Sequence, residues 1–238
     1  MIMSAKSTEK AVVCAPREIL LKAAMIRLSG VHAEIDAGYQ VLRKYHKTVT
    51  VFGSARLKPS TMYYKKAREL SFVLASYGYT IVTGGGGGIM EASNRGAKEA
   101  MGNSIGFNIE LPNEQKLNDY TTDSHAFSHF APRKIVMTMF ADAYVFFPGG
   151  FGTMDELTEI LTLIQTGKAV KAPVILFGRE FWDAFDHFER FDMYERNKLV
   201  GRLDEKLYTI TDSIDDAARL VISNTTYCDH SPRELISE

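Results

Sequence analysis

The residues best suited to chemistry lie in one stretch, Pro148–Glu156, which reads Pro-Gly-Gly-Phe-Gly-Thr-Met-Asp-Glu. An apolar run, 143–147, precedes it, and apolar residues at helical spacing follow it. A glycine turn between a strand and a helix is suited to anions, because a ligand can approach the backbone and the first helical amides point at negative charge. Asp155 and Glu156 would repel a phosphate. Their presence therefore favours chemistry beside a bound phosphate over simple phosphate binding.

Two further glycine turns follow expected strands. Residues 53–55, Gly-Ser-Ala, follow the run 48–52, and the five glycines 84–88 follow the run 80–83. Because the carboxyl ends of parallel strands share one edge of a sheet, we expect the three turns to converge on one pocket. No Walker lysine follows the glycines 84–88 or the glycine turn 149–152. The run 84–88 matches the dinucleotide-binding fingerprint only loosely. A single phosphate, held by the Gly149–Thr153 turn and the Thr153 hydroxyl, fits these residues better.

Strands and helices alternate along the chain, which predicts an α/β fold. We expect a Rossmann-like, doubly wound, mainly parallel sheet with helices on both faces and an N-terminal helical extension wrapped around it. The expected strands are 48–52, 80–83, 104–109, 143–147, 173–177 and 207–211, and the expected helices are 63–77, 89–101, 133–140, 153–166, 181–194 and 214–222, with one or two more between 16 and 45 and a loop over 112–132.

The expected organisation is a tail and helical extension over 1–45, a Rossmann-like nucleotide-binding domain over 46–225, and a C-terminal tail over 226–238. With 238 residues, 45% of them hydrophobic, the chain can bury a large single core. A net charge of −1 gives no basic surface for nucleic acid. Two unpatterned cysteines, no signal-peptide pattern and no apolar run of about 18 residues favour a cytoplasmic protein without membrane contact.

The stretch Pro148–Glu156 matches the P-G-G-x-G-T-x-x-E signature, and in this the chain resembles the LONELY GUY family. These are cytokinin riboside 5′-monophosphate phosphoribohydrolases, long mislabelled as lysine decarboxylase-like proteins. The glycine turn 84–88, the Arg133-Lys134 pair and Gly53-Ser54 also agree, so the resemblance spans about 49–222. The long N-terminal segment resembles the bacterial branch. Plant members carry Met-His before the Arg-Lys pair, and this chain does not.

The resemblance implies hydrolysis of the N-glycosidic bond of a nucleoside 5′-monophosphate, either a cytokinin nucleotide or AMP, with no cofactor and no metal. It also implies a homodimer or a larger homo-oligomer. By the family match Glu156 is catalytic, stabilising an oxocarbenium-like ribose and activating water. Arg133 is the second expected catalytic residue, because its guanidinium is a rigid, charged donor. The competing explanations are a helix-dipole preference for Glu156 and a solvated surface for Arg133.

The expected substrate-binding residues lie on the turns and on the two helices beside them: Ser54, Gly85, Gly86, Met90, Lys134, Gly149, Gly150, Gly152, Thr153 and Glu159. Several have a structural alternative. Ser54 could cap the next turn, and Met90 could belong to the core. Lys134 is expected to contact phosphate or ribose. Glu159 could orient Arg133, touch the base or face solvent.

Other functions and sites compete with this prediction. A carrier of a phosphorylated, nucleotide-like cofactor would share the fold and the glycine turns without needing both Arg133 and Glu156. A decarboxylase would need pyridoxal phosphate on a lysine, and Lys134 and Lys168 have no such context. His125 and His129 are four residues apart, but without an acidic or cysteine partner they are expected to be surface residues rather than metal ligands.

One aromatic series also invites a functional explanation. The side chains recur at helical spacing and could form a stacking platform, but that spacing favours a buried core face or a subunit interface. The series comprises Phe181, Trp182, Phe185, Phe188 and Phe191.

Overall fold

The computed structural model describes residues 16–110, 116–139, 141–201 and 204–224. The strands are β1 Thr48–Phe52, β2 Thr80–Thr83, β3 Ser104–Ile109, β4 Asp123–Phe127, β5 Ala143–Phe146, β6 Val174–Phe177 and β7 Thr209–Thr211. The helices are α1 Arg17–Leu28, α2 Val31–Leu42, α3 Met62–Ser76, α4 Ile89–Glu99, α5 Phe130–Thr138, α6 Phe151–Gln165, α7 Arg179–His187, the π-helix η1 Phe188–Arg196, the short 3-10 helix η2 Asp204–Lys206 and α8 Ile214–Ile222.

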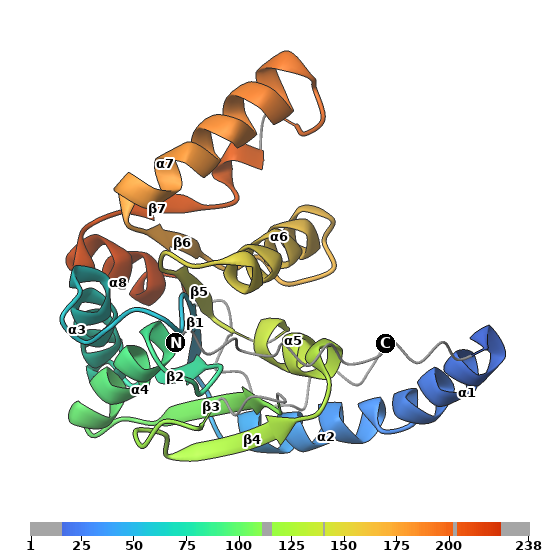
Figure 1. Ribbon diagram of the computed structural model, residues 1–238. Coiled ribbons are helices and arrows are strands. Elements are labelled where there is room, and N and C mark those ends of the chain that lie inside the picture. The colour runs from blue at the N-terminus through green and yellow to red at the C-terminus, as the bar shows by residue number, and fades with distance from the viewer. Residues whose placement is uncertain (1–15, 111–115, 140, 202–203, 225–238) are drawn as a thin grey trace, which may run out of the picture.

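The strands form one parallel sheet in the order β4-β3-β2-β1-β5-β6-β7, which confirms the expected α/β fold (Figure 1). The chain moves outward from β1 to β4 and then returns to place β5 on the other side of β1, where Val49 pairs with Ala143. The strand order therefore reverses between β1 and β5. In doubly wound sheets, ligands bind outside the carboxyl ends of the strands at this reversal point.

Two apolar layers hold the helices on the sheet. One layer joins α3, α4 and α8 to the central strands, with Leu74 and Ile81 fully buried. The other joins α2, α5, α6 and α7 to the opposite face around Phe146 and Leu157. All residues of β1, β2, β5 and β6 are buried, which explains why these strands are short continuous apolar or β-branched runs without alternation.

The loop expected over 112–132 is wrong in part, because β4 lies within it. This strand pairs with β3 in parallel, from Ile105 with Asp123 to Ile109 with Phe127. Its sequence, Asp-Ser-His-Ala-Phe, has no β-branched residue, and only Phe127 is buried. An edge strand of this kind is stabilised by its neighbour and by α2, so its own residues give no strand signal.

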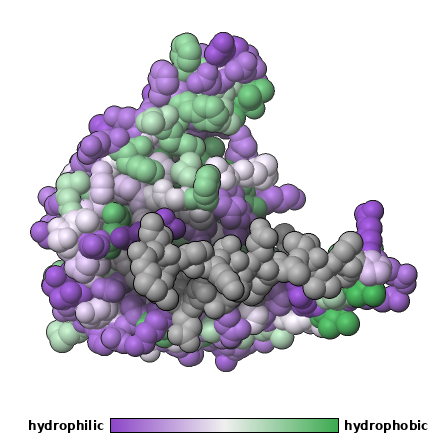
Figure 2. Space-filling model, in the orientation of Figure 1, coloured by the Kyte–Doolittle hydropathy of each residue, from purple (hydrophilic) through white to green (hydrophobic). Residues whose placement is uncertain are grey.

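The N-terminal extension forms two helices with different surroundings. Helix α2 packs against α5, and Gly38 lets the two approach so closely that an added Cβ would lie 2.7 Å from Val136. Helix α1 has no buried residue and extends away from the sheet (Figure 1). Its apolar side chains lie on the surface (Figure 2). The expectation that the extension wraps the main body is therefore right for α2 and wrong for α1.

The helix expected over 181–194 is α7 continued by η1, and together they project beyond the sheet (Figure 1). Trp182 is fully buried, and its indole N–H donates to the Phe146 carbonyl oxygen at 3.2 Å. Phe181, Phe188 and Phe191 are exposed. The core explanation of the aromatic series is therefore confirmed for Trp182 and wrong for these three. Among the described helices, none has both the length and the apolar character that a bilayer crossing requires.

Candidate active site

Backbone hydrogen bonds join the three glycine turns at the reversal point. The Ser54 amide donates to the Pro148 carbonyl oxygen at 3.0 Å, and the Ile89 amide donates to the Ser54 carbonyl oxygen at 3.0 Å. Gly88 has a φ of 64°, and an added Cβ there would collide with the Ser54 carbonyl and lie 2.6 Å from Ala55. The turn after β1 thus touches both the turn after β2 and the turn after β5. The predicted convergence of the three turns is confirmed.

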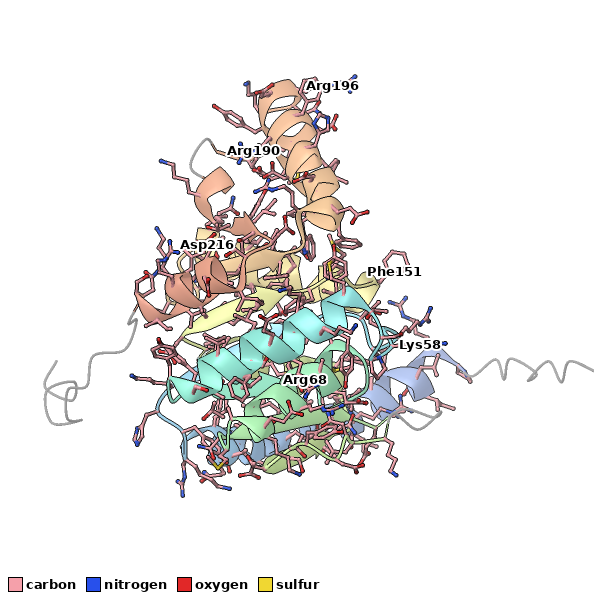
Figure 3. All side chains as sticks on the ribbon, turned by 90° about the vertical axis from the view of Figure 1, so that its left-hand side faces the viewer. Lys58, Arg68, Phe151, Arg190, Arg196 and Asp216 are labelled. Carbon is pink, nitrogen blue, oxygen red and sulfur yellow. The ribbon has the colours of Figure 1, made fainter. Side chains whose placement is uncertain are left out.

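The signature turn is packed on one side and open on the other. Thr153 is buried, and an added Cβ on Gly149 would collide with its side chain. An added Cβ on Gly150 or Gly152 would meet no protein atom within 4 Å. Phe151, the first residue of α6, is 97% exposed and projects from the molecule (Figure 3). Protein packing therefore does not require glycine at positions 150 and 152.

Glu156 lies in the second turn of α6, because this helix begins at Phe151 rather than at 153. The favourable effect of a helix N-terminus on an acid is confined to the first turn, so the helix dipole is a weak explanation of this residue. The side chain is half-buried. Burial raises the pKa of the Glu156 carboxyl to about 7, although the Arg133 charge opposes the rise. This carboxyl therefore titrates near neutral pH, as many catalytic acids and bases do.

Arg133 is buried although it is charged, with 8% of its surface exposed. Its Nε donates to the carbonyl oxygen of Phe107 in β3, at 2.7 Å. Its guanidinium also lies against Gly84 at the end of β2. Burial lowers the pKa of Arg133, and the Glu156 charge opposes the fall. The surface explanation of Arg133 is wrong, and the residues expected to be catalytic interact electrostatically.

Lys134 is held by two acids of the neighbouring helix. Its Nζ lies 2.8 Å from a carboxylate oxygen of Asp155 and 3.0 Å from one of Glu159. Burial alone would lower the pKa of Lys134, but its hydrogen bonds to these acids outweigh that effect and raise it. The three side chains tie α5 to α6 on either side of Glu156. A contact of Lys134 with phosphate, or of Glu159 with the base, remains a prediction.

Two other expected contacts have structural partners. The Ser54 hydroxyl accepts a hydrogen bond from the Arg56 amide at 3.2 Å, which is the turn-capping alternative. Met90 is buried, and its sulfur lies close to Gly84. Both residues keep their proposed ligand contacts only as predictions. His129 pairs with Glu34 at 2.8 Å, and within the described ranges no group of three or more His, Cys, Asp or Glu could hold a metal ion.

A buried amide network holds the turn after β2, and the sequence analysis missed it. The Asn94 side-chain oxygen accepts from the Thr83 hydroxyl at 2.7 Å and from the Asn118 amide group at 2.9 Å. The Asn118 backbone and side chain donate to the carbonyl oxygens of Gly85 and Gly86 at 2.8 and 3.0 Å. The available signal was Asn94 itself, a polar residue on the same helix face as Met90.

Comparison with known protein families assigns this chain to one of them. The model of the family described as possible lysine decarboxylase matches residues 90–221, more than half of the chain. The chain belongs to this family. The match includes Arg133, Lys134 and the whole signature stretch, and it confirms the resemblance to the LONELY GUY proteins.

Curated relatives agree with this assignment at modest identity. One is the cytokinin riboside 5′-monophosphate phosphoribohydrolase LOG of Oryza sativa subsp. japonica, 28% identical over 195 residues that cover 81% of this chain and 72% of the relative. Another is the cytokinin riboside 5′-monophosphate phosphoribohydrolase of Mycobacterium marinum, 29% identical over 154 residues that cover 63% of this chain and 81% of the relative.

Solved structures confirm the fold of this family member. The molybdenum cofactor carrier protein of Chlamydomonas reinhardtii has a TM-score of 0.55 and 23% identity, covering 76% of this chain and 99% of that chain. The molybdenum cofactor binding protein of Rippkaea orientalis has a TM-score of 0.54 and 20% identity, covering 75% of this chain and 97% of that chain. Identities this low establish the fold alone.

Proposed function

We propose that this protein hydrolyses the N-glycosidic bond of nucleoside 5′-monophosphates, either cytokinin nucleotides or AMP, to give the free base and ribose 5-phosphate. The main support is the electrostatic pairing of buried Arg133 with Glu156 beside the three joined glycine turns. The names of the Oryza and Mycobacterium relatives are consistent with this reaction.

The signature turn is the proposed phosphate site. Its open side at Gly150 and Gly152 leaves room for a ligand, and the first amides of α6 point at that space. The buried Thr153 side chain lies against Gly149 at the same turn. A 5′-phosphate bound here would direct the ribose toward Glu156, which lies one helical turn beyond Thr153.

The proposed chemistry follows from the charges that develop during cleavage. As the bond from C1′ to the base nitrogen breaks, its electron pair leaves with the base and the ribose becomes positively charged. The ionised Glu156 stabilises this cation and accepts a proton from the water that attacks C1′. The departing base takes up one proton and Glu156 releases the one that it accepted from water, so the carboxylate is regenerated and the products are neutral base and ribose 5-phosphate. Arg133 offers donors to the ribose or to the base as it leaves.

The carrier alternative explains the fold but gives no role to the buried Arg133 and the half-buried Glu156 that interacts with it electrostatically. Burying Arg133 and half-burying Glu156 costs desolvation free energy, and their mutual attraction offsets only part of it, since burial dominates both pKa shifts. A carrier could bind a phosphorylated ligand with the glycine turns alone. The likeness to molybdenum cofactor carriers extends to the fold, which a nucleotide hydrolase can share.

The test is to incubate the purified protein with AMP and with isopentenyladenosine monophosphate and to measure the free base by chromatography. We expect base and ribose 5-phosphate in equal amounts, with no change when a chelator is added. Adenosine, which lacks the phosphate, should react far more slowly. Binding of both monophosphates without release of base would instead support the carrier alternative.

We also propose that the protein assembles as a homodimer or a larger homo-oligomer. The exposed aromatic side chains Phe181, Phe188 and Phe191 are suited to a subunit contact. Light scattering coupled to gel filtration measures the mass directly. A monomeric mass at micromolar concentration would contradict this proposal without affecting the hydrolase proposal.

A further inference from the structure

We infer that Gly84 is a positioning residue for Arg133: the absence of a side chain at this position leaves the space that the guanidinium occupies. The inference rests on the proposed function, because it assigns a role within the same reaction. It separates Gly84 from its neighbours Gly85 and Gly86, which are proposed to bind the substrate.

The contact follows from the sheet register. Thr83 pairs with Gly106 in the parallel β2–β3 ladder, so Gly84, just past the end of β2, is level with Phe107 inside β3. The Arg133 Nε donates to the Phe107 carbonyl oxygen at 2.7 Å. From there the guanidinium extends over Gly84. An added Cβ on Gly84 would collide with an Nη atom of Arg133 and lie 3.3 Å from its Cζ.

Backbone conformation does not account for this glycine. Gly85 and Gly88 have φ angles of 70° and 64°, where other residues are strained, but Gly84 is not among the positive-φ residues. Gly84 is also buried, with the Arg133 guanidinium and the Met90 sulfur against it. Space for these two groups is therefore what the structure requires at position 84.

A methyl group at Gly84 would displace the catalytic guanidinium. Arg133 would have to move away from Gly84, and this weakens its hydrogen bond to Phe107 and changes its electrostatic interaction with Glu156. A misplacement of about 1 Å in a reacting constellation can lower the rate by about 100-fold. The proposed phosphate turn, Gly149–Thr153, follows β5, whereas Gly84 follows β2. We therefore expect KM to change less than kcat.

The first test compares Gly84→Ala with Gly87→Ala. An added Cβ on Gly87 would meet only the Ala55 carbonyl oxygen, at an ordinary 3.5 Å, so this variant makes the same backbone change without the collision. We expect Gly84→Ala to lower kcat by roughly 10- to 100-fold with KM changed less than about threefold. The fold-decrease in kcat of Gly87→Ala should be less than a tenth of that of Gly84→Ala. Equal losses in the two variants would overturn the inference.

A double-mutant cycle with Arg133→Lys isolates the contact. Lysine lacks the Nη atom that collides, so Gly84→Ala should lower kcat far less in the Arg133→Lys background than in the wild-type background. An equal fold-decrease in kcat on adding Gly84→Ala to either background would overturn the inference. If Gly84→Ala alone does not fold, the double variant should recover a folded protein. A double variant that fails to fold as well would also overturn it.

A crystal structure of Gly84→Ala gives a readout that does not depend on activity. We expect the guanidinium displaced from the Phe107 carbonyl oxygen. An unchanged Arg133 would overturn the inference. Release of no base by the wild-type protein would end the hydrolase proposal, yet this crystallographic comparison would still test the space at Gly84.

Discussion

The Arg133 guanidinium and the Glu156 carboxyl come from the consecutive helices α5 and α6, and each shifts the pKa of the other toward the ionised form. Burial acts in the opposite direction on both groups and is the larger cause, so the pKa of Glu156 is raised and that of Arg133 is lowered. A charged pair held in a partly desolvated place is typical of functional sites.

Replacing Glu156 by glutamine should remove turnover while preserving binding. The amide has nearly the same shape but cannot neutralise a cationic ribose or accept a proton from water, so we expect kcat to fall by about 10³-fold. Titration calorimetry with AMP, under conditions where the variant does not turn over, should give a Kd of Glu156→Gln within about threefold of the wild-type KM. Glu180→Gln, at an exposed position in α7, is the control and should retain full activity. Full activity in Glu156→Gln would refute the assigned role.

The value of kcat/KM should rise with pH and level off above neutrality. The reaction needs the ionised carboxylate, and burial raises the pKa of Glu156 to about 7 in the ligand-free protein, so kcat/KM is expected to be half-maximal near that pH. Steady-state assays between pH 5.5 and 8.5 measure the profile. A rate that is flat or falling across this range would show that Glu156 does not act as the base.

The same pKa shift predicts a pH-dependent effect on stability. The folded state binds the Glu156 proton more tightly than the unfolded state, so the carboxyl destabilises the fold increasingly as pH rises from about 4.5 to about 7. Glu156→Gln removes this cost. We expect it to be more stable than the wild type at pH 8, by on the order of 1–3 kcal/mol, and to show little difference at pH 4.5. Urea unfolding at the two pH values measures the difference in the free energy of unfolding between the variant and the wild type. An equal difference at both pH values would show that stability does not depend on the protonation of Glu156.

Replacing Lys134 by alanine distinguishes two roles. The Lys134 charge lowers the pKa of Glu156 and is paired with Asp155 and Glu159, so its removal should move the midpoint of the pH–rate profile above 7 by several tenths of a unit. A direct phosphate contact would in addition raise KM by tenfold or more, whereas a purely electrostatic role would leave KM nearly unchanged. Lys168→Ala, an exposed position just beyond α6, is the matched control.

The buried amide network should be sensitive to a single deletion. Asn94→Ala would leave the Thr83, Ser104 and Asn118 side chains with lost partners in the interior. An unsatisfied buried polar group costs about 1–3 kcal/mol, so we expect a loss of roughly 2–4 kcal/mol in the free energy of unfolding. Asn224→Ala, an exposed position after α8, should change it by less than about 0.5 kcal/mol. Equal effects of the two variants would show that the network is not stabilising.

The sequence predicted the fold where burial dictated residue type. Strands β1 and β2 have the predicted bounds, because both lie between helical layers and keep continuous apolar or β-branched runs. Edge strand β4 was missed, since its exposed face accepts polar residues. The single helix expected over 181–194 is in fact an α-helix followed by a π-helix, and this change of winding has no compositional signal in the sequence.

The site was predictable as far as local patterns extend. The glycine turns and the strand rule predicted that three segments meet, and the signature stretch singled out Glu156. The partners of Lys134 depend on how α5 packs against α6, and the burial of Arg133 and the space at Gly84 depend on how α5 packs against β2 and β3. Such contacts between distant segments are set by tertiary packing and leave no periodic trace.

The adjacency of β1 and β5 has a consequence for synthesis on the ribosome. The Thr48 amide donates to the Asp142 carboxylate across 94 positions of the chain. Until β5 emerges, β1 can pair only with β2, and its other edge presents unpaired amides and carbonyls to any neighbouring strand. A polypeptide interrupted before residue 143 would therefore be a candidate for aggregation and for chaperone capture.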